Sequence, residues 1–186
     1  ISGEGEEMRQ SFQNLIFALL LSVLLVYMLL ASQFESFLHP FTVMFAVPLA
    51  IMGVIGALFL TGNSLSLGVY IGGIMLGGIV VNNSIILVDY TNTLRKKGFL
   101  RQEAVIEGGR TRLRPILMTA LTTIFGLVPL AMGFGEGSEI RAPLAITVIG
   151  GLTSSTIMTL FIIPILYSSF EDLRDILKIR FSKGQK

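Results

Sequence analysis

The 186-residue chain is 52% hydrophobic and only 14% charged, with a net charge of +2. A soluble domain usually carries about 25% charged residues. The absence of cysteine excludes disulfides and thiolate metal sites, and the lone His39 cannot form a metal site by itself. A charge at the bilayer centre costs about 2.5–3.5 kcal/mol, so charges gathered into short blocks between apolar runs predict a membrane protein.

Five segments approach the length needed to cross a bilayer, about 20 apolar residues for a core of about 30 Å. The expected spans are 12–31, 41–60, 69–88, 116–132 and 144–167. The sequence therefore predicts an all-α membrane protein, a bundle of about five transmembrane helices over 12–168. Residues 1–11 are expected to end an extracytoplasmic domain, 91–115 to form a basic cytoplasmic loop, and 169–186 to form a cytoplasmic tail.

Six prolines punctuate these spans. Three are expected at helix starts, where a missing N–H costs nothing: Pro40, Pro115 and Pro143. Three lie deeper and are expected to kink or end their helices: Pro48, Pro129 and Pro164. Within the basic loop, residues 102–107 mix apolar and charged side chains and predict a short surface helix.

The lysines and arginines predict the orientation of the chain. Residues 91–115 and the tail together hold 12 of the 14 cations, and only Arg9 and Arg141 fall on the other side. Because basic segments stay in the cytoplasm, we expect an extracytoplasmic N-terminal end and a cytoplasmic C-terminus. This topology accounts for the cations, so nucleic-acid binding is not expected.

The third expected span carries pairs of glycines at i, i+4 spacing: Gly68 with Gly72, and Gly73 with Gly77. Small residues at this spacing let helix backbones approach closely. Ordinary helix packing explains such pairs. The alternative, which the pattern favours less, is a helix that slides against its neighbours during a transport cycle.

The same span continues into two adjacent amides, Asn82 and Asn83. An amide in hydrocarbon must find a partner or lose several kcal/mol, so the pair indicates either interhelical hydrogen bonding or a polar site on an ion or substrate route. Asp89 lies seven residues after Asn82, on much the same face. It is either a solvated charge at the membrane interface or a cytoplasmic proton exit. Thr119 in the next span is weaker evidence, because threonine can bond to its own helix.

No hydrolytic constellation appears, neither a zinc-binding His–Glu helix nor a Gly–Lys–Ser phosphate loop. We therefore expect neither an enzyme nor a cofactor.

Three blocks carry a resemblance to a known family: ASQFESFLHPFTVMFAVPLAIMG over 31–53, GIVVNNSIILVDY over 78–90, and GGRTRLRPILMTALTTIFGLVPLAMGFGEGSE over 108–139. Together they resemble the C-terminal transmembrane half of the resistance–nodulation–division (RND) exporters, in the AcrB-like multidrug branch. The resemblance implies that the chain is a fragment, helices eight to twelve of a twelve-helix transporter. The N-terminal half of the same transporter would be missing.

The resemblance also implies a function and partners. Members of this branch export hydrophobic and amphiphilic compounds, such as drugs and detergents, by proton antiport across the bacterial inner membrane. They form homotrimers in the lipid bilayer and, in double-membrane bacteria, dock with a periplasmic adaptor and an outer-membrane channel. Two alternatives remain open: an RND relative that assists protein export or moves lipid, and a non-transporting membrane scaffold or accessory protein.

Position by position, the resemblance implies a proton relay. Asn83 matches the relay asparagine, Thr119 the relay threonine, and Arg112 an arginine near the cytoplasmic side. Asn82 stands where the drug exporters carry a lysine. An asparagine cannot carry the positive charge that would balance a deprotonated carboxylate pair. Either that charge is balanced differently here, or the coupling ion or its stoichiometry differs.

Overall fold

The structure is a computed structural model that describes residues 2–34 and 38–183, and this part of the chain is helical without strands. The helices are α1 (Ser2–Phe34), α2 (Leu38–Met44), α3 (Ala46–Thr61), α4 (Leu67–Lys96), α5 (Arg101–Ala131) and α6 (Ser138–Lys183). Within these described ranges, five stretches are long and apolar enough to span a membrane, with α2 and α3 together forming one of them. The predicted all-α membrane bundle is confirmed.

The chain divides into two compact units, Ile1–Pro40 and Phe41–Lys186. The first unit is essentially α1, whose large apolar side chains are mostly exposed, as at Phe17 (68%) and Leu29 (64%). A helix that is apolar on all sides is suited to contact with lipid. Residues 35–37 of the expected connection after this helix, and 184–186 of the expected tail, lie outside the described residues.

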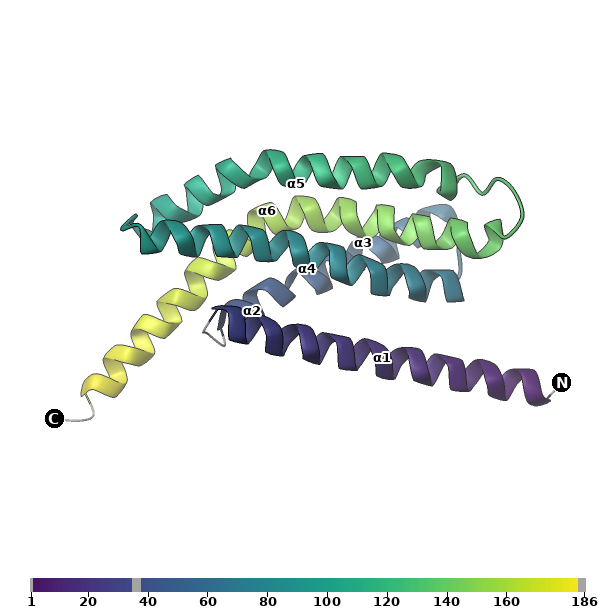
Figure 1. Cartoon of the computed structure of the whole chain (residues 1–186), viewed down its shortest axis with the longest axis horizontal. Coiled ribbons are helices and arrows are strands. Elements are labelled where there is room, and N and C mark those ends of the chain that lie inside the picture. Colours follow the sequence, from purple (N-terminus) through teal and green to yellow (C-terminus); the bar gives the residue numbers. More distant parts are fainter. Residues whose placement is uncertain (1, 35–37, 184–186) are drawn as a thin grey trace. The chain divides into compact units, whose positions relative to one another are not determined.

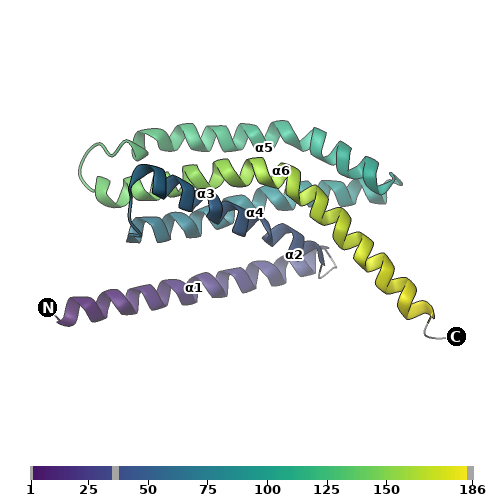
Figure 2. The same cartoon turned by 180° about the vertical axis from the view of Figure 1, so that it is seen from behind.

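In the second unit, α6 packs against α3, α4 and α5 (Figures 1 and 2). The core follows the side of α6 that carries Ala145, Val148, Leu152 and Ile163, each at most 1% exposed. Thr147 is also buried, and its hydroxyl donates to the Pro143 carbonyl at 2.7 Å. The helix thus satisfies its own polar group without needing a partner helix.

Small residues bring α4 and α6 into backbone contact. A Cβ atom on Gly68 would overlap the carbonyl oxygen of Ile140, and one on Gly72 would lie 2.8 Å from that of Leu144. Only glycine leaves room for this approach. Gly73 and Gly77 differ, because a Cβ at either position would have nothing within 4 Å. The second glycine pair therefore makes no close packing contact within the described part of the chain.

Two of the prolines expected at helix starts lie inside helices, so that part of the prediction is wrong: Pro115 in α5 and Pro143 in α6. The helix α5 already begins at Arg101, where Glu103 accepts a hydrogen bond from the Leu100 N–H at 3.3 Å. A capped start upstream lets the helix run through a proline whose neighbours satisfy the freed carbonyl.

The deeper prolines coincide with a break, an end and a bend. The break between α2 and α3 falls just after Met44, whose carbonyl receives no hydrogen bond from Pro48. The helix α5 ends two residues after Pro129. The helix α6 contains Pro164, and its yellow C-terminal section leaves the line of its green section (Figure 1).

The helices also extend beyond the apolar spans. The helix α4 continues to Lys96 and α5 begins at Arg101, so their connection is four residues long rather than the whole of 91–115. Gly98 makes this turn with a φ of 94°, a left-handed conformation that favours glycine. The stretch 102–107, expected as a separate surface helix, forms the first turns of α5.

Candidate functional site

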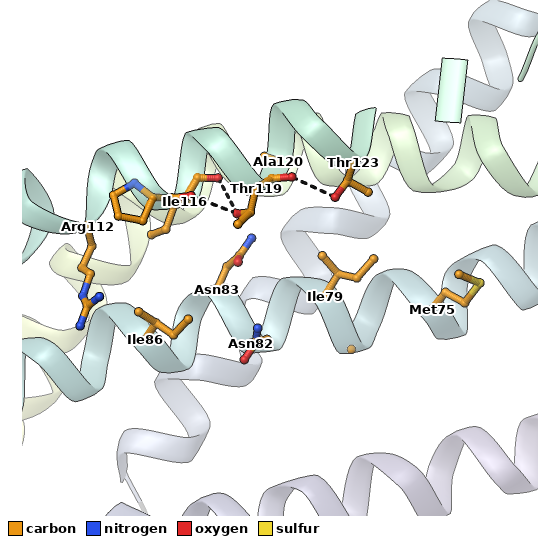
Figure 3. Close-up of a pocket in the computed structure, with 12 residues that line it drawn as sticks. Met75, Ile79, Asn82, Asn83, Ile86, Arg112, Ile116, Thr119, Ala120 and Thr123 are labelled. Carbon is orange, nitrogen blue, oxygen red and sulfur yellow. Dashed lines mark hydrogen bonds between the residues drawn. The ribbon is translucent and has the colours of Figure 1, made fainter. Parts of the chain in front are cut away.

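A cavity of about 530 Å³ lies between α4 and α5 in the second unit (Figure 3). Most of its wall is apolar, and the polar groups are few. The lining residues are Met75, Gly78, Ile79, Asn82, Asn83, Ile86, Arg112, Pro115, Ile116, Thr119, Ala120 and Thr123. They recur every three or four residues along each helix, so one face of α4 and one face of α5 form the walls.

One end of the α4–α5 pair is held tightly. A Cβ on Gly108 of α5 would lie 2.7 Å from the hydroxyl oxygen of Thr91 on α4, so the helices nearly touch there. The buried Thr91 hydroxyl donates to the Leu87 carbonyl of its own helix at 2.9 Å. At the same end, α6 accepts a hydrogen bond from Arg101 of α5 and donates one from Tyr167 to α4. The cavity opens farther along the same two helices.

The two asparagines point in different directions. Both line the cavity, but the half-buried Asn83 points across it towards Thr119 on α5, whereas the exposed Asn82 does not point towards α5 (Figure 3). Neither amide has a hydrogen-bond partner among the described residues. In hydrocarbon an unpartnered amide costs several kcal/mol, so each needs water, an ion or another protein group beside it.

The threonines of α5 bond to their own helix. Thr119 donates to the carbonyls of Pro115 and Ile116 at 3.2 and 3.0 Å, and Thr123 donates to that of Thr119 at 2.9 Å. Because each hydroxyl donates its hydrogen to a backbone carbonyl, its oxygen still has lone pairs that can accept a hydrogen bond from another donor. Thr122 makes the same kind of bond, to Met118 at 2.8 Å, but does not line the cavity.

Arg112 brings the only charge among the lining residues. Its side chain reaches from α5 towards α4 (Figure 3). The guanidinium carbon lies 4.6 Å from the centre of the Tyr90 ring on α4. This stacking is a cation–π contact. The Nε atom is buried and has no hydrogen-bond partner within the described residues.

Sequence reasoning placed Asn82, Asn83, Thr119 and Arg112 near a common site, and the structure brings these four together around the cavity. Asp89 is exposed and is not among the lining residues. Sequence reasoning missed Tyr90. An aromatic residue near the basic end of the span, facing an arginine of the next helix, could have indicated it.

None of the lining side chains exchanges a proton near neutral pH, since amides and hydroxyls do not titrate there and arginine stays protonated. The described residues also contain no group of three or more His, Cys, Asp or Glu side chains that could hold a metal ion. The cavity offers one cation, two amides and two hydroxyl acceptors within an apolar wall. Such a lining can receive a polar or anionic group.

Within the described residues, helices long and apolar enough to cross a membrane indicate a multi-pass membrane protein. The chain matches the model of the AcrB/AcrD/AcrF family over residues 1–171 and belongs to this family of RND transporters.

Three relatives illustrate the match. The chain is 43% identical over 173 residues to the swarming motility protein SwrC of Bacillus subtilis, covering 92% of this chain and 16% of that protein. It is 38% identical over 174 residues to the multidrug resistance protein MdtC of Proteus mirabilis, covering 93% and 17%. Against MdtC of Escherichia coli O157:H7 it is 36% identical over 186 residues, covering 100% and 18%.

The fold is similar to the crystal structure of a heavy metal efflux pump, with a TM-score of 0.81 and 36% identity over 90% of this chain and 17% of that one. The chain thus spans about a sixth of the length of the relatives it matches.

Proposed function

We propose that the chain works as part of the membrane machinery of an RND exporter, in which ion movement through the α4–α5 cavity is coupled to the export of hydrophobic or amphiphilic compounds. The coupling ion in this proposal is the proton. Each proton that crosses the full membrane potential releases about 2.3 kcal/mol per 100 mV. A site that uses this energy must expose polar groups inside the bilayer.

The observation that carries the proposal is the set of unpartnered polar groups in the cavity. Asn83 and the buried Nε of Arg112 lie within or next to the apolar run of their helices, with no partner in the described chain. In a helix whose only role is packing, such groups would be unfavourable, because they cost several kcal/mol when left unpaired in lipid. Polar residues inside a membrane are by default candidates for an ion path.

The proposal includes the cellular setting. The basic ends of α4 and α5 face the cytoplasm, and the beginning of α1 faces the opposite side of a bacterial inner membrane. The bundle works in a trimer with the rest of an RND protein and, in double-membrane bacteria, with a periplasmic adaptor and an outer-membrane channel. The names of the relatives, which mention multidrug resistance and heavy metal efflux, support export as the shared activity.

The test is Asn82→Leu, made in the chain's native gene context and reconstituted in vesicles that contain a pH indicator, with ethidium as the test compound. We expect the variant to fold, because Asn82 is exposed and unpaired in the second unit, yet to lose ethidium-linked proton movement. Thr122→Val is the matched control, since Thr122 does not line the cavity. A variant that keeps full coupling while gaining stability would favour the scaffold alternative.

A further inference from the structure

The side of α5 that faces away from the cavity carries a continuous apolar stripe, which we call the outer stripe. Its members are exposed and recur every three or four residues, so they share one face of the helix. They are Leu113, Leu117, Leu121, Phe125 and Val128. Thr119, which lines the cavity, is two residues from Leu117 and from Leu121, about 200° around the helix. The outer stripe and the cavity are therefore separate surfaces of one helix.

Two arginines continue the outer stripe at its basic end. Arg110 and Arg114 are both exposed and are four residues apart, so they lie one turn from each other on the same face of α5. Neither makes a hydrogen bond or an ion pair with another described residue. Two cations at this spacing repel each other and slightly destabilise a helix. An anion bound between them would remove that repulsion.

The nearest acidic residue along α5 does not neutralise the two arginines. Glu107 lies three residues before Arg110, and its carboxylate accepts a hydrogen bond from the Thr111 hydroxyl at 3.4 Å. Within the described part of the chain, no ion pair joins it to Arg110 or Arg114. The positive charge of both arginines is therefore available to an anion from outside the helix.

The two arginines lie where the apolar region of the bundle ends. Arg112, which stands between them in the sequence, stacks on Tyr90 of α4, two residues beyond the expected span 69–88. From Arg114 to Phe125 the helix rises by about 17 Å. This rise is close to one leaflet of a hydrocarbon core that is about 30 Å thick. A charged end followed by an apolar length of one leaflet matches the headgroup and acyl chains of a phospholipid.

We propose that this face of α5 binds an anionic phospholipid from the leaflet at its basic end, with the phosphate between Arg110 and Arg114 and the acyl chains along the outer stripe. Guanidinium groups bind phosphate oxygens in paired, charge-assisted hydrogen bonds. The headgroup must be anionic, because a zwitterionic lipid carries its own cation beside the phosphate and offers the arginines no net negative charge. The inference goes beyond ion coupling and does not depend on it, since neither arginine lines the cavity.

The test measures which lipid contacts the outer stripe. The protein, in its native gene context, carries Leu121→Cys labelled with bimane and is reconstituted in vesicles of phosphatidylcholine and phosphatidylglycerol. This chain has no cysteine of its own, so within it the label is specific. Bromine atoms on the acyl chains of either lipid quench bimane on contact. At equal mole fractions, quenching by brominated phosphatidylglycerol relative to brominated phosphatidylcholine measures the preference for the anionic lipid.

We expect phosphatidylglycerol to be preferred by about fivefold or more, roughly the contribution of one basic residue beside an anionic membrane surface. Arg110→Gln combined with Arg114→Gln should remove the preference, whereas Arg110→Lys combined with Arg114→Lys should keep most of it. Lys96→Gln combined with Lys97→Gln is the matched control, because it removes the same charge from exposed positions at the end of α4. This control should leave the preference unchanged.

Three results would overturn the inference. Equal quenching by the two lipids, with both arginines present, would reduce this face to ordinary lipid contact. A preference that survives the loss of both arginines would place the anionic lipid elsewhere. If neither lipid quenches the label, protein covers the outer stripe, from another segment of the transporter or from a second copy.

Discussion

The helix α4 meets α6 and α5 through contacts of opposite kind. Towards α6 it presents Gly68 and Gly72, and the two backbones touch without room for a methyl group. Towards α5 it presents Asn83 and isoleucines around a cavity of about 530 Å³. The face towards α6 is closed by backbone contact, whereas the face towards α5 borders an open cavity that is mostly apolar with a few polar groups. The same helix is therefore a fixed support on one side and a cavity wall on the other.

The two faces of α4 should tolerate different substitutions. Backbone contact has no flexible side chain to absorb an added atom, so substitutions at the α4–α6 face should act on folding. At the amides that line the cavity, substitutions should act on transport and spare the fold, because Asn82 and Asn83 have no hydrogen-bond partner among the described residues.

The largest effect is expected from Gly68→Ala. Its methyl group would overlap the Ile140 carbonyl, and overpacking of this kind costs about 1–3 kcal/mol or more. Gly77→Ala is the matched control on the same helix, with nothing within 4 Å of the new atom, and should be neutral or slightly stabilising. Thermal unfolding in detergent measures both. Equal stability of the two variants would contradict the close backbone contact between α4 and α6.

Asn83→Leu should lower transport without lowering stability, the opposite of what is expected at Gly68. The amide has no partner among the described residues, so its loss should leave the unfolding temperature unchanged or raise it. Proton-coupled ethidium export should fall at least about tenfold, since a group worth more than about 1.4 kcal/mol to the coupled step is removed. A variant that unfolds early but transports normally, once folded, would make the cavity face structural after all.

Thr119→Val and Thr122→Val compare two neighbouring hydroxyls. Both donate to their own backbone, and only Thr119 lines the cavity. Losing one acceptor in the site should lower the transport rate by about two- to tenfold, the worth of one hydrogen bond. Thr122→Val should transport like the wild type. Initial rates in vesicles distinguish the pair, and equal losses would argue for a general effect on α5.

The smallest effect is expected at the closed end of the bundle. The Tyr167 hydroxyl donates to Asn92 at 2.5 Å, and Tyr167→Phe should lower stability by about 0.6 kcal/mol, the average for hydrogen bonds between membrane helices. Transport should be unaffected. A loss of transport without a loss of stability would instead assign this hydrogen bond to the working cycle.

The number and approximate positions of the membrane-spanning helices could be predicted from the sequence, because long apolar runs indicate transmembrane helices. The positions of Asn82, Asn83, Thr119 and Arg112 around one site also agree with the resemblance to the family. The prediction that Pro115 and Pro143 begin helices was wrong, because it took the start of each apolar span as the start of the helix. The helix α5, for example, begins upstream of its apolar span, at its own capped end. Membrane spans and helices are different objects, and helices extend beyond the bilayer.

The glycine pairs show a second limit. Gly68 with Gly72 and Gly73 with Gly77 have the same spacing, and only the first pair meets α6. Successive residues of a helix are about 100° apart, so the two pairs face different sides. Which side meets a neighbour depends on how the helices are arranged in space, and local spacing carries no record of that. The Tyr90 contact with Arg112 was missed for the same reason.

Whether the α4–α5 cavity is an ion-coupling site can be tested with single cysteines, because this chain contains none. Asn83→Cys is compared with Leu121→Cys, an exposed position on α5 that does not line the cavity, using a small water-soluble thiol reagent in membranes. We predict that Cys at 83 reacts faster and that an imposed proton gradient changes its rate. If both cysteines react equally slowly with or without the gradient, the cavity is not on an ion path.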